Sequence, residues 1–182
     1  MDLVLASQSP RRRELLATAG FQFTVRARPV NELRGLDEPP RQYVSRLARE
    51  KADAAWEDKQ EVVLGADTTV VLGDRVLEKP KDTEEARDML RALSGVRHTV
   101  ITGICLRGPA GSLVDCESTH VYFTTMTDRE IEDYSRSGES MDTAGAYAIQ
   151  GLASKFFERI EGCYFNVMGL PLALFYRHWK NL

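Results

Sequence analysis

The sequence predicts an α/β protein in which helices flank a mixed, twisted β-sheet. Apolar segments of strand length alternate along the chain with segments whose apolar residues recur at helical spacing. Short turns join some of the expected strands and helices join others, so both antiparallel and parallel pairing are expected. The 182 residues contain no internal repeat and no linker-like stretch, and they suit one domain, residues 1–182, or two lobes that share one sheet.

Short apolar runs bounded by turn residues indicate the strands. In chain order they are expected at residues 3–6, 62–64, 68–72, 75–77, 98–106, 114–123 and 156–160. The second and third of these strands are expected on either side of Gly65, Ala66 and Asp67. The dipeptide Gly73-Asp74 is typical of a hairpin turn and leads into the fourth strand.

Helical spacing and capping residues indicate the helices. They are expected at residues 10–19, at about residues 41–56, at residues 83–93 and 127–137, and after Pro171. Ser9 before Pro10 is a typical helix start, and Thr127 with Glu130 forms a capping box. The second helix places four side chains at helical spacing, namely Tyr43, Leu47, Lys51 and Ala54. The third presents a single apolar face made of Ala86, Met89, Leu90 and Leu93.

Charge and cysteine content restrict the partners and the setting. The formal net charge of −3 disfavours a nucleic-acid partner, because duplex binding depends on clustered Lys and Arg that displace counterions. The three cysteines form no C-x-x-C pair, which favours a reducing cytoplasm. The chain has no apolar run of membrane-spanning length and no secretory signal pattern at its start. We therefore expect a cytoplasmic protein with neither a nucleic-acid nor a membrane partner.

Residues 7–12 (Ser-Gln-Ser-Pro-Arg-Arg) are the first candidate for binding an anion. An expected strand leads directly into a helix whose first turn holds hydroxyls and a run of arginines. Free backbone N–H groups at a helix start favour an anion, and a guanidinium matches phosphate oxygens bidentately. Taken alone, however, a capped helix with a solvated basic face is the commoner explanation.

Other acids and bases lie near expected strand ends. Asp67 follows a buried apolar strand, at the sheet edge where α/β proteins collect ligands, although a turn aspartate that caps a local N–H explains it equally well. Glu78 and Lys79 end a hairpin, where an exposed charged turn is the usual explanation. Lys51 lies among apolar helix positions, as snorkelling lysines often do, and Glu32 is not diagnostic by itself.

Residues 142–151 (Asp-Thr-Ala-Gly-Ala-Tyr-Ala-Ile-Gln-Gly) combine small residues and two glycines with one tyrosine. Such a loop lets a flat ligand approach closely, and Gln150 offers a donor and an acceptor from one amide. Taken alone, a tight loop before a strand is the commoner explanation. The histidines His98, His120 and His178 are far apart in sequence, so we expect them to be structural rather than zinc ligands.

The order of these motifs resembles the Maf family of nucleotide pyrophosphatases. It reads S-x-S-P-R-R, E, K-A, G-A-D-T, E-K-P, S-G, D-x-A-G-A-Y-x-I-Q-G and N-V-x-G-L-P, and it covers nearly the whole chain from Leu3 to Pro171. The resemblance implies a two-lobed α/β fold similar to inosine triphosphate pyrophosphatases, with the nucleotide in a central cleft between the lobes. It also implies a cytoplasmic homodimer, a divalent metal cofactor (Mg²⁺ or Mn²⁺), and hydrolysis between the α- and β-phosphates.

The resemblance also assigns roles to residues. The basic and hydroxyl side chains that surround the triphosphate are Ser7, Arg11, Arg12, Lys51 and Lys79. By this resemblance, Glu32 and Asp67 are the acids of the reaction centre, and Asp67 is the family's proposed proton acceptor. We hypothesise that both acids hold the metal and orient a water. Because cations surround Asp67, we expect its pKa to be depressed, which favours metal binding and water orientation over general-base catalysis.

Three positions resemble the branch of the family that acts on thymidine and uridine triphosphates, namely Arg11, Thr68 and Gln150. Uracil and thymine present an N3–H donor beside carbonyl acceptors, and the amide of Gln150 can match both. An unpaired base edge in a dry pocket costs ~1–3 kcal/mol, which is enough to discriminate between bases. The sequence therefore predicts dTTP and UTP as substrates.

Two positions depart from the family pattern, and two other functions compete with the first. Thr143 replaces a usual Lys, which removes one positive charge near the loop, and Asn31 stands where an acid often precedes Glu32.

One competing function is a non-catalytic nucleotide-binding regulator of septum formation. The other is a pyrophosphatase for non-standard purine nucleotides on the related fold. The acids Glu32 and Asp67 favour an enzyme, and the Ser-Pro-Arg-Arg opening favours the Maf family over the purine enzymes.

Overall fold

The computed structural model describes all residues from Met1 to Leu182. The chain forms two compact units. Unit 1 comprises Met1–Thr68, Ile101–Glu117 and Phe165–Leu182, and unit 2 comprises Thr69–Val100 and Ser118–Tyr164. Both contribute to one seven-stranded sheet of order β2-β1-β3-β5-β6-β7, in which β4 pairs with β3. The cleft expected between two lobes stays a prediction.

The sheet is mixed, as the sequence predicts. Its strands are β1 (Asp2–Leu5), β2 (Phe23–Val25), β3 (Glu61–Leu72), β4 (Arg75–Leu77), β5 (Arg97–Gly108), β6 (Gly111–Phe123) and β7 (Phe157–Glu161). Strand β1 is parallel to both β2 and β3, whereas β4 is antiparallel to β3 and β7 is antiparallel to β6. Helices connect the parallel strands, and a tight turn joins β3 to β4.

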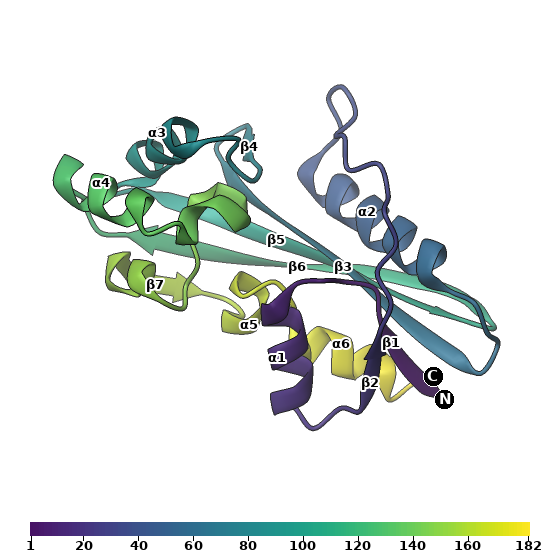
Figure 1. The fold of residues 1–182 in the computed structure, drawn as a ribbon. Helices are drawn as coiled ribbons and strands as arrows, with labels where there is room; N and C mark the ends of the chain where they lie inside the picture. Colours follow the sequence, from purple (N-terminus) through teal and green to yellow (C-terminus); the bar gives the residue numbers. More distant parts are fainter. The chain divides into compact units, whose positions relative to one another are not determined.

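The helices are α1 (Pro10–Thr18), α2 (Pro40–Ala55), α3 (Thr83–Leu93), α4 (Asp128–Arg136), α5 (Tyr164–Val167) and α6 (Leu172–Trp179). None of them combines the length and the apolar content that crossing a membrane requires. Within unit 1, α2 lies on one side of the sheet, and α1 and α6 lie on the other (Figure 1). Within unit 2, α3 packs against α4. Helices therefore flank the sheet, as predicted.

Two glycines bring α2 unusually close to the sheet in unit 1. A Cβ atom on Gly65 of β3 would lie 2.0 Å from the carbonyl oxygen of Ala48, and one on Gly103 of β5 would lie 2.5 Å from that of Val44. The α2 backbone therefore rests directly on the strands. The alanines of α2 that face the sheet, Ala48, Ala52 and Ala55, are fully buried in the same apolar cluster as Val4 and Val63.

Two predictions made from local sequence patterns in unit 2, the apolar face of α3 and the capping box of α4, are confirmed. The whole apolar face predicted for α3 is buried. At the start of α4, Thr127 Oγ1 accepts from the Glu130 N–H at 3.3 Å, and a Glu130 carboxylate oxygen accepts from the Thr127 N–H at 2.8 Å. Both partners of the predicted capping box are thus in place, which satisfies backbone donors that a helix start would otherwise leave unpaired.

Some expectations for the elements are wrong. The two strands expected on either side of Gly65 are one continuous strand, β3. Gly65 does not form a turn; it lacks a side chain because the α2 backbone packs directly against it. Ser9 precedes α1, but its side chain makes no cap; the Ser7 hydroxyl instead accepts from the Ser9 N–H at 3.2 Å. Ala54 is exposed, whereas Ala55 faces the sheet. The sequence pattern also missed β2, α5 and three short 3₁₀ turns, none longer than five residues.

Candidate active site

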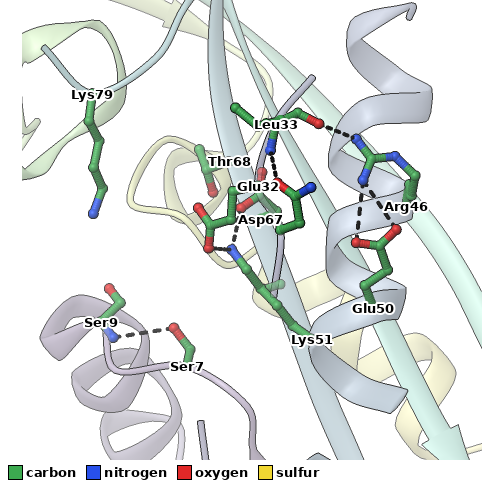
Figure 2. Close-up of polar contacts among 12 residues, drawn as sticks. Ser7, Ser9, Glu32, Leu33, Arg46, Glu50, Lys51, Asp67, Thr68 and Lys79 are labelled. Atoms are coloured by element: carbon green, nitrogen blue, oxygen red, sulfur yellow. Dashed lines mark hydrogen bonds and ion pairs between the residues drawn. The ribbon is translucent and has the colours of Figure 1, made fainter. Parts of the chain in front are cut away.

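Two carboxylates meet one ammonium in unit 1. Lys51 Nζ on α2 lies 2.6 Å from Asp67 Oδ1 on β3 and 2.9 Å from Glu32 Oε1 in the segment before α2 (Figure 2). Only 14% of the Lys51 side chain is exposed. A snorkelling lysine would carry its ammonium into water, so that explanation is wrong for Lys51. The structure thus brings together three of the predicted site residues.

Asp67 occupies a position set by the pairing of β3. The last β3 residue that pairs with β1 is Leu64, opposite Leu5, and the chain of β1 then leaves the sheet. Asp67 lies within β3, beyond the carboxyl end of β1. Because β3 continues to Leu72, the prediction that Asp67 follows the end of its own strand is wrong, and so is the alternative of a turn aspartate. Asp67 is buried, with 8% of its surface exposed.

Burial controls the proton affinity of Asp67. Removal of its carboxylate from water raises its pKa above the ordinary value, and the charges of Lys51 and Arg12 oppose this shift without reversing it. The expectation of a depressed pKa is therefore wrong for the protein by itself. A carboxylate with a raised pKa is a better proton acceptor, so the reason for placing general-base catalysis second no longer holds.

Arg12 joins three of the sequence motifs. Its Nε donates to the carbonyl of Gly169 at 2.8 Å, and Nη1 donates to the Ser7 hydroxyl at 3.1 Å and the Ala66 carbonyl at 2.8 Å. Its Nη2 donates to the Thr68 hydroxyl at 3.0 Å. These contacts use most of the N–H groups of the guanidinium, so Arg12 has a structural role that its sequence pattern did not reveal.

This hydrogen-bond network supports Asp67 directly. Ala66 and Thr68, which both accept from Arg12, flank Asp67 in β3. The hydroxyls of Thr68 and Thr102 lie 3.0 Å apart, and Thr102 donates to the carbonyl of Asn166 at 3.0 Å. The strand on both sides of the acid is therefore held by side chains from α1 and β5, and backbone carbonyls around α5 accept hydrogen bonds from these side chains. The half-buried Arg11 lies beside Arg12 on α1.

Unit 2 holds the remaining predicted site residues. Lys79, in the exposed turn after β4, lies 3.0 Å from a carboxylate oxygen of Asp142. The Gly145 N–H donates to the Glu78 carbonyl at 3.2 Å, so the two motifs that carry Lys79 and Gln150 are joined through the backbone. Gln150 is exposed. Thr143, which replaces the usual Lys, is buried, and its hydroxyl has no hydrogen-bond partner.

An aromatic cluster fixes the loop of residues 142–151 in unit 2. The hydroxyl of Tyr147 lies 2.7 Å from Nε2 of His98, and the Tyr147 ring contacts Phe123 and Phe157 edge to face. His98 was expected to be structural, and its burial agrees. Only the tyrosine within the loop motif hinted at this cluster, because His98 lies far from that motif in sequence.

We expect His98 to make folding stability depend on pH. Burial lowers the pKa of His98 to about 4 from its ordinary 6.5. Between these values the unfolded chain binds a proton that the folded chain does not, so acidification destabilises the fold, by roughly 2 kcal/mol at pH 5. Urea unfolding at pH 7.5 and pH 5 measures the loss. The loss of unfolding free energy between the two pH values should be smaller in His98→Gln, which keeps a hydrogen-bonding group for Tyr147. An equal loss in both proteins would show that His98 does not titrate as described.

The acids of unit 1 fit a divalent metal that also binds phosphate. No group of three or more His, Cys, Asp or Glu side chains in the chain could hold a metal ion by itself. Glu32 and Asp67 both contact the same ammonium, so both carboxylates reach one cationic position. Mg²⁺ commonly takes one or two protein carboxylates and completes its shell with waters and substrate phosphates, which matches this pair.

These features define an α/β protein with a mixed-charge site that is assembled from motifs dispersed along the chain. The sequence matches the family described as Maf-like protein over residues 2–182. The chain therefore belongs to the Maf family.

Curated relatives match over almost their full length. A protein of Koribacter versatilis, named dTTP/UTP pyrophosphatase, is 51% identical over 100% of this chain and 94% of its own. A protein of Anaeromyxobacter dehalogenans with the same name is 54% identical over 94% of this chain and 89% of its own. Among solved structures, the Staphylococcus aureus Ham1 protein is 15% identical, with a TM-score of 0.48, and the match covers 68% of this chain and 72% of that one.

Proposed function

We propose that the protein hydrolyses dTTP and UTP to the nucleoside monophosphate and pyrophosphate. The observation that carries the proposal is the contact of Lys51 with both Asp67 and Glu32, together with the charge of Arg12 acting on Asp67. A binding protein would need the cations but not a buried acid beside them. Full-length relatives that are about half identical and bear the name dTTP/UTP pyrophosphatase support the choice of substrates.

The proposed roles follow from charge and position. The side chains that hold the triphosphate are Ser7, Arg11, Arg12, Lys51 and Lys79. The guanidinium of Arg12 has five N–H groups, and four of them donate to groups within the protein, so the fifth is the one that binds the triphosphate. Glu32 and Asp67 hold a divalent metal, Mg²⁺ or Mn²⁺. When bound, the metal supplies positive charge that polarises the phosphate oxygens and stabilises the leaving group.

The reaction needs a positioned water and a stabilised leaving group. Oxygen of water forms a bond to the α-phosphorus, the bond from that phosphorus to the bridging oxygen breaks, and pyrophosphate leaves with the electron pair. Asp67, which contacts Lys51 at 2.6 Å, orients the water, and it is the proposed proton acceptor. Lys51 and Lys79 stabilise the charge that develops on pyrophosphate.

Gln150 is expected to select the base. Gln150→Glu replaces the amide N–H₂ by a second acceptor, which no longer matches a pyrimidine carbonyl but suits the adjacent donors of guanine. The ratio of kcat/KM for UTP to that for GTP should fall by ~10–100-fold. Steady-state pyrophosphate release measures it, with Gln22→Glu, which adds the same charge at an exposed position before β2, as the control. An unchanged ratio in Gln150→Glu would mean that the base is recognised elsewhere.

A nucleotide panel tests the proposed function against its two rivals. Pyrophosphate release is measured for dTTP, UTP, ITP, XTP and the remaining common triphosphates, with Mg²⁺ or Mn²⁺ and with neither. The proposal expects release from dTTP and UTP that depends on the metal. Release mainly from ITP and XTP would instead identify a purine-type enzyme. Binding without release would identify a regulator.

The setting of the protein is proposed on the same basis. We propose a homodimer that works in the cytoplasm, where nucleotide pools are maintained and cysteines stay reduced. The three cysteines, Cys105, Cys116 and Cys163, are free thiols, which is compatible with this proposal.

A further inference from the structure

The position of Glu32 depends on backbone contacts as well as on the ion pair between its carboxylate and Lys51. Glu32 lies between β2 and α2, in a segment without a helix or strand, and 58% of its side chain is exposed. Holding an exposed carboxylate on an irregular segment in one place costs conformational entropy, and contacts that already fix the backbone around it reduce that cost. Helix α2 supplies those contacts.

Two side chains of α2 hold the backbone at and beside Glu32. The Tyr43 hydroxyl donates to the Glu32 carbonyl at 2.9 Å, and Arg46 Nη2 donates to the next carbonyl, that of Leu33, at 3.1 Å. The Leu33 N–H donates to the Asn31 side chain at 3.1 Å. Figure 2 shows Arg46 reaching from α2 to Leu33, one residue beyond Glu32.

Arg46 is itself fixed by a bidentate ion pair with Glu38. Its Nε lies 2.7 Å from Oε1 of Glu38, and its Nη2 lies 2.8 Å from Oε2. The same Oε2 accepts from the Gly35 N–H at 2.9 Å, and the Glu38 carbonyl accepts from Arg34 Nε at 2.8 Å. The Arg46 guanidinium lowers the pKa of Glu38 to about 2. The ion pair therefore closes the loop of residues 32–38 onto α2, the helix that carries Lys51.

We propose that Tyr43, Arg46 and Glu38 form a clamp that positions the Glu32 carboxylate for the reaction. The three are positioning residues, since none of them is assigned a contact with substrate. The inference rests on the proposed function, in which Glu32 belongs to the reaction centre. It assigns a catalytic consequence to an ion pair that would otherwise count only toward stability.

The chain offers a matched ion pair for comparison. Arg49 lies three residues after Arg46 on α2 and pairs with Asp53 at 3.5 Å, with 62% and 43% of the two side chains exposed. The corresponding values for Arg46 and Glu38 are 33% and 15%. Exposed pairs of the Arg49 type contribute little to stability and hold no loop. Arg49→Met therefore removes the same side chain from the same helix without opening the clamp.

The experiment compares Arg46→Met, Tyr43→Phe and Arg49→Met with the parent enzyme. Arg46→Met is expected to lower kcat for dTTP by roughly 10-fold or more with KM within about twofold, because small misplacements of reacting groups are costly. Tyr43→Phe should also lower kcat. Arg46→Lys keeps the positive charge but not the planar set of N–H donors, so its kcat should lie between those of Arg46→Met and the parent. Arg49→Met should match the parent.

Hydrogen–deuterium exchange provides a readout that does not depend on activity. Faster exchange is expected for the backbone amides of residues 31–38 in Arg46→Met and Tyr43→Phe, and not in Arg49→Met. If exchange rises there but kcat stays at the parent value, or if Arg46→Met and Arg49→Met behave alike, the clamp has no catalytic role. Such a result in an active parent leaves the proposed function standing. A parent that releases no pyrophosphate from any nucleotide overturns both.

Discussion

Asp67→Asn should lower kcat for dTTP and UTP by roughly 10³-fold, because the amide can neither accept a proton nor supply negative charge to a metal. The fold should survive. The amide has nearly the shape of the carboxylate, its oxygen can still accept from Lys51, and burial already disfavours the charged form of Asp67. Lys51 also keeps its contact with Glu32. Pyrophosphate release at saturating substrate measures the loss, and circular dichroism checks the fold.

The control for Asp67→Asn is the same change at Asp53 on α2. Asp53 likewise contacts cationic side chains, those of Arg49 and Arg107, but makes no contact with Lys51 that would link it to the reaction. Asp53→Asn should keep the parent rate. If Asp67→Asn turned over dTTP as fast as the parent does, Asp67 could not be the acid of the reaction centre.

Gly65→Ala should cost about 3 kcal/mol of folding stability or more, or prevent folding. The new Cβ would lie 2.0 Å from the Ala48 carbonyl oxygen and 2.8 Å from the Ala52 nitrogen, both in the backbone of α2. A backbone cannot rotate away as a side chain can, so α2 must move off β3. In a domain of this size such a loss lowers Tm by roughly 6–12 °C. Urea unfolding and thermal denaturation measure it.

Gly108→Ala provides the matched control for Gly65→Ala. Gly108 ends β5, and a Cβ there would meet only Val62 Cγ2, at an ordinary contact distance of 3.7 Å. Its stability should stay within about 1 kcal/mol of the parent. Any Gly65→Ala protein that folds should also lose activity, because α2 carries Lys51 toward Asp67. Equal stability of the two variants would show that α2 does not rest on the strands as described.

Much of the fold could be predicted because its signals are local. The apolar face of α3 and the capping box of α4 depend on residues within a few positions of one another, and both are confirmed. The sequence predicts two strands where the structure has the single strand β3, because a glycine within a strand resembles a turn when its spatial neighbours are unknown. The packing of α2 against β3 explains why residue 65 is glycine, and the local sequence does not reveal this contact. Strand β2 was missed because it has three residues and is largely exposed.

The site residues could be named only because their motifs, taken in order, resemble a family, and their environments could not be predicted. The charges around Asp67 were predicted, but the sign of its pKa shift depends on burial, which a sequence does not give. The motif also gave no sign that Arg12 binds carbonyls within the protein, since its partner Gly169 lies near the other end of the chain. The contact of Arg46 with the segment that carries Glu32 was not predicted either, because that segment has no helix or strand pattern that would place it against α2.

Hydrolysis of dTTP in ¹⁸O-labelled water tests the central claim most directly. Attack on the α-phosphorus beside Asp67 predicts that the label enters thymidine monophosphate and that pyrophosphate carries none, as mass spectrometry of the two products would show. Label in pyrophosphate, or formation of a nucleoside diphosphate with inorganic phosphate, would contradict it.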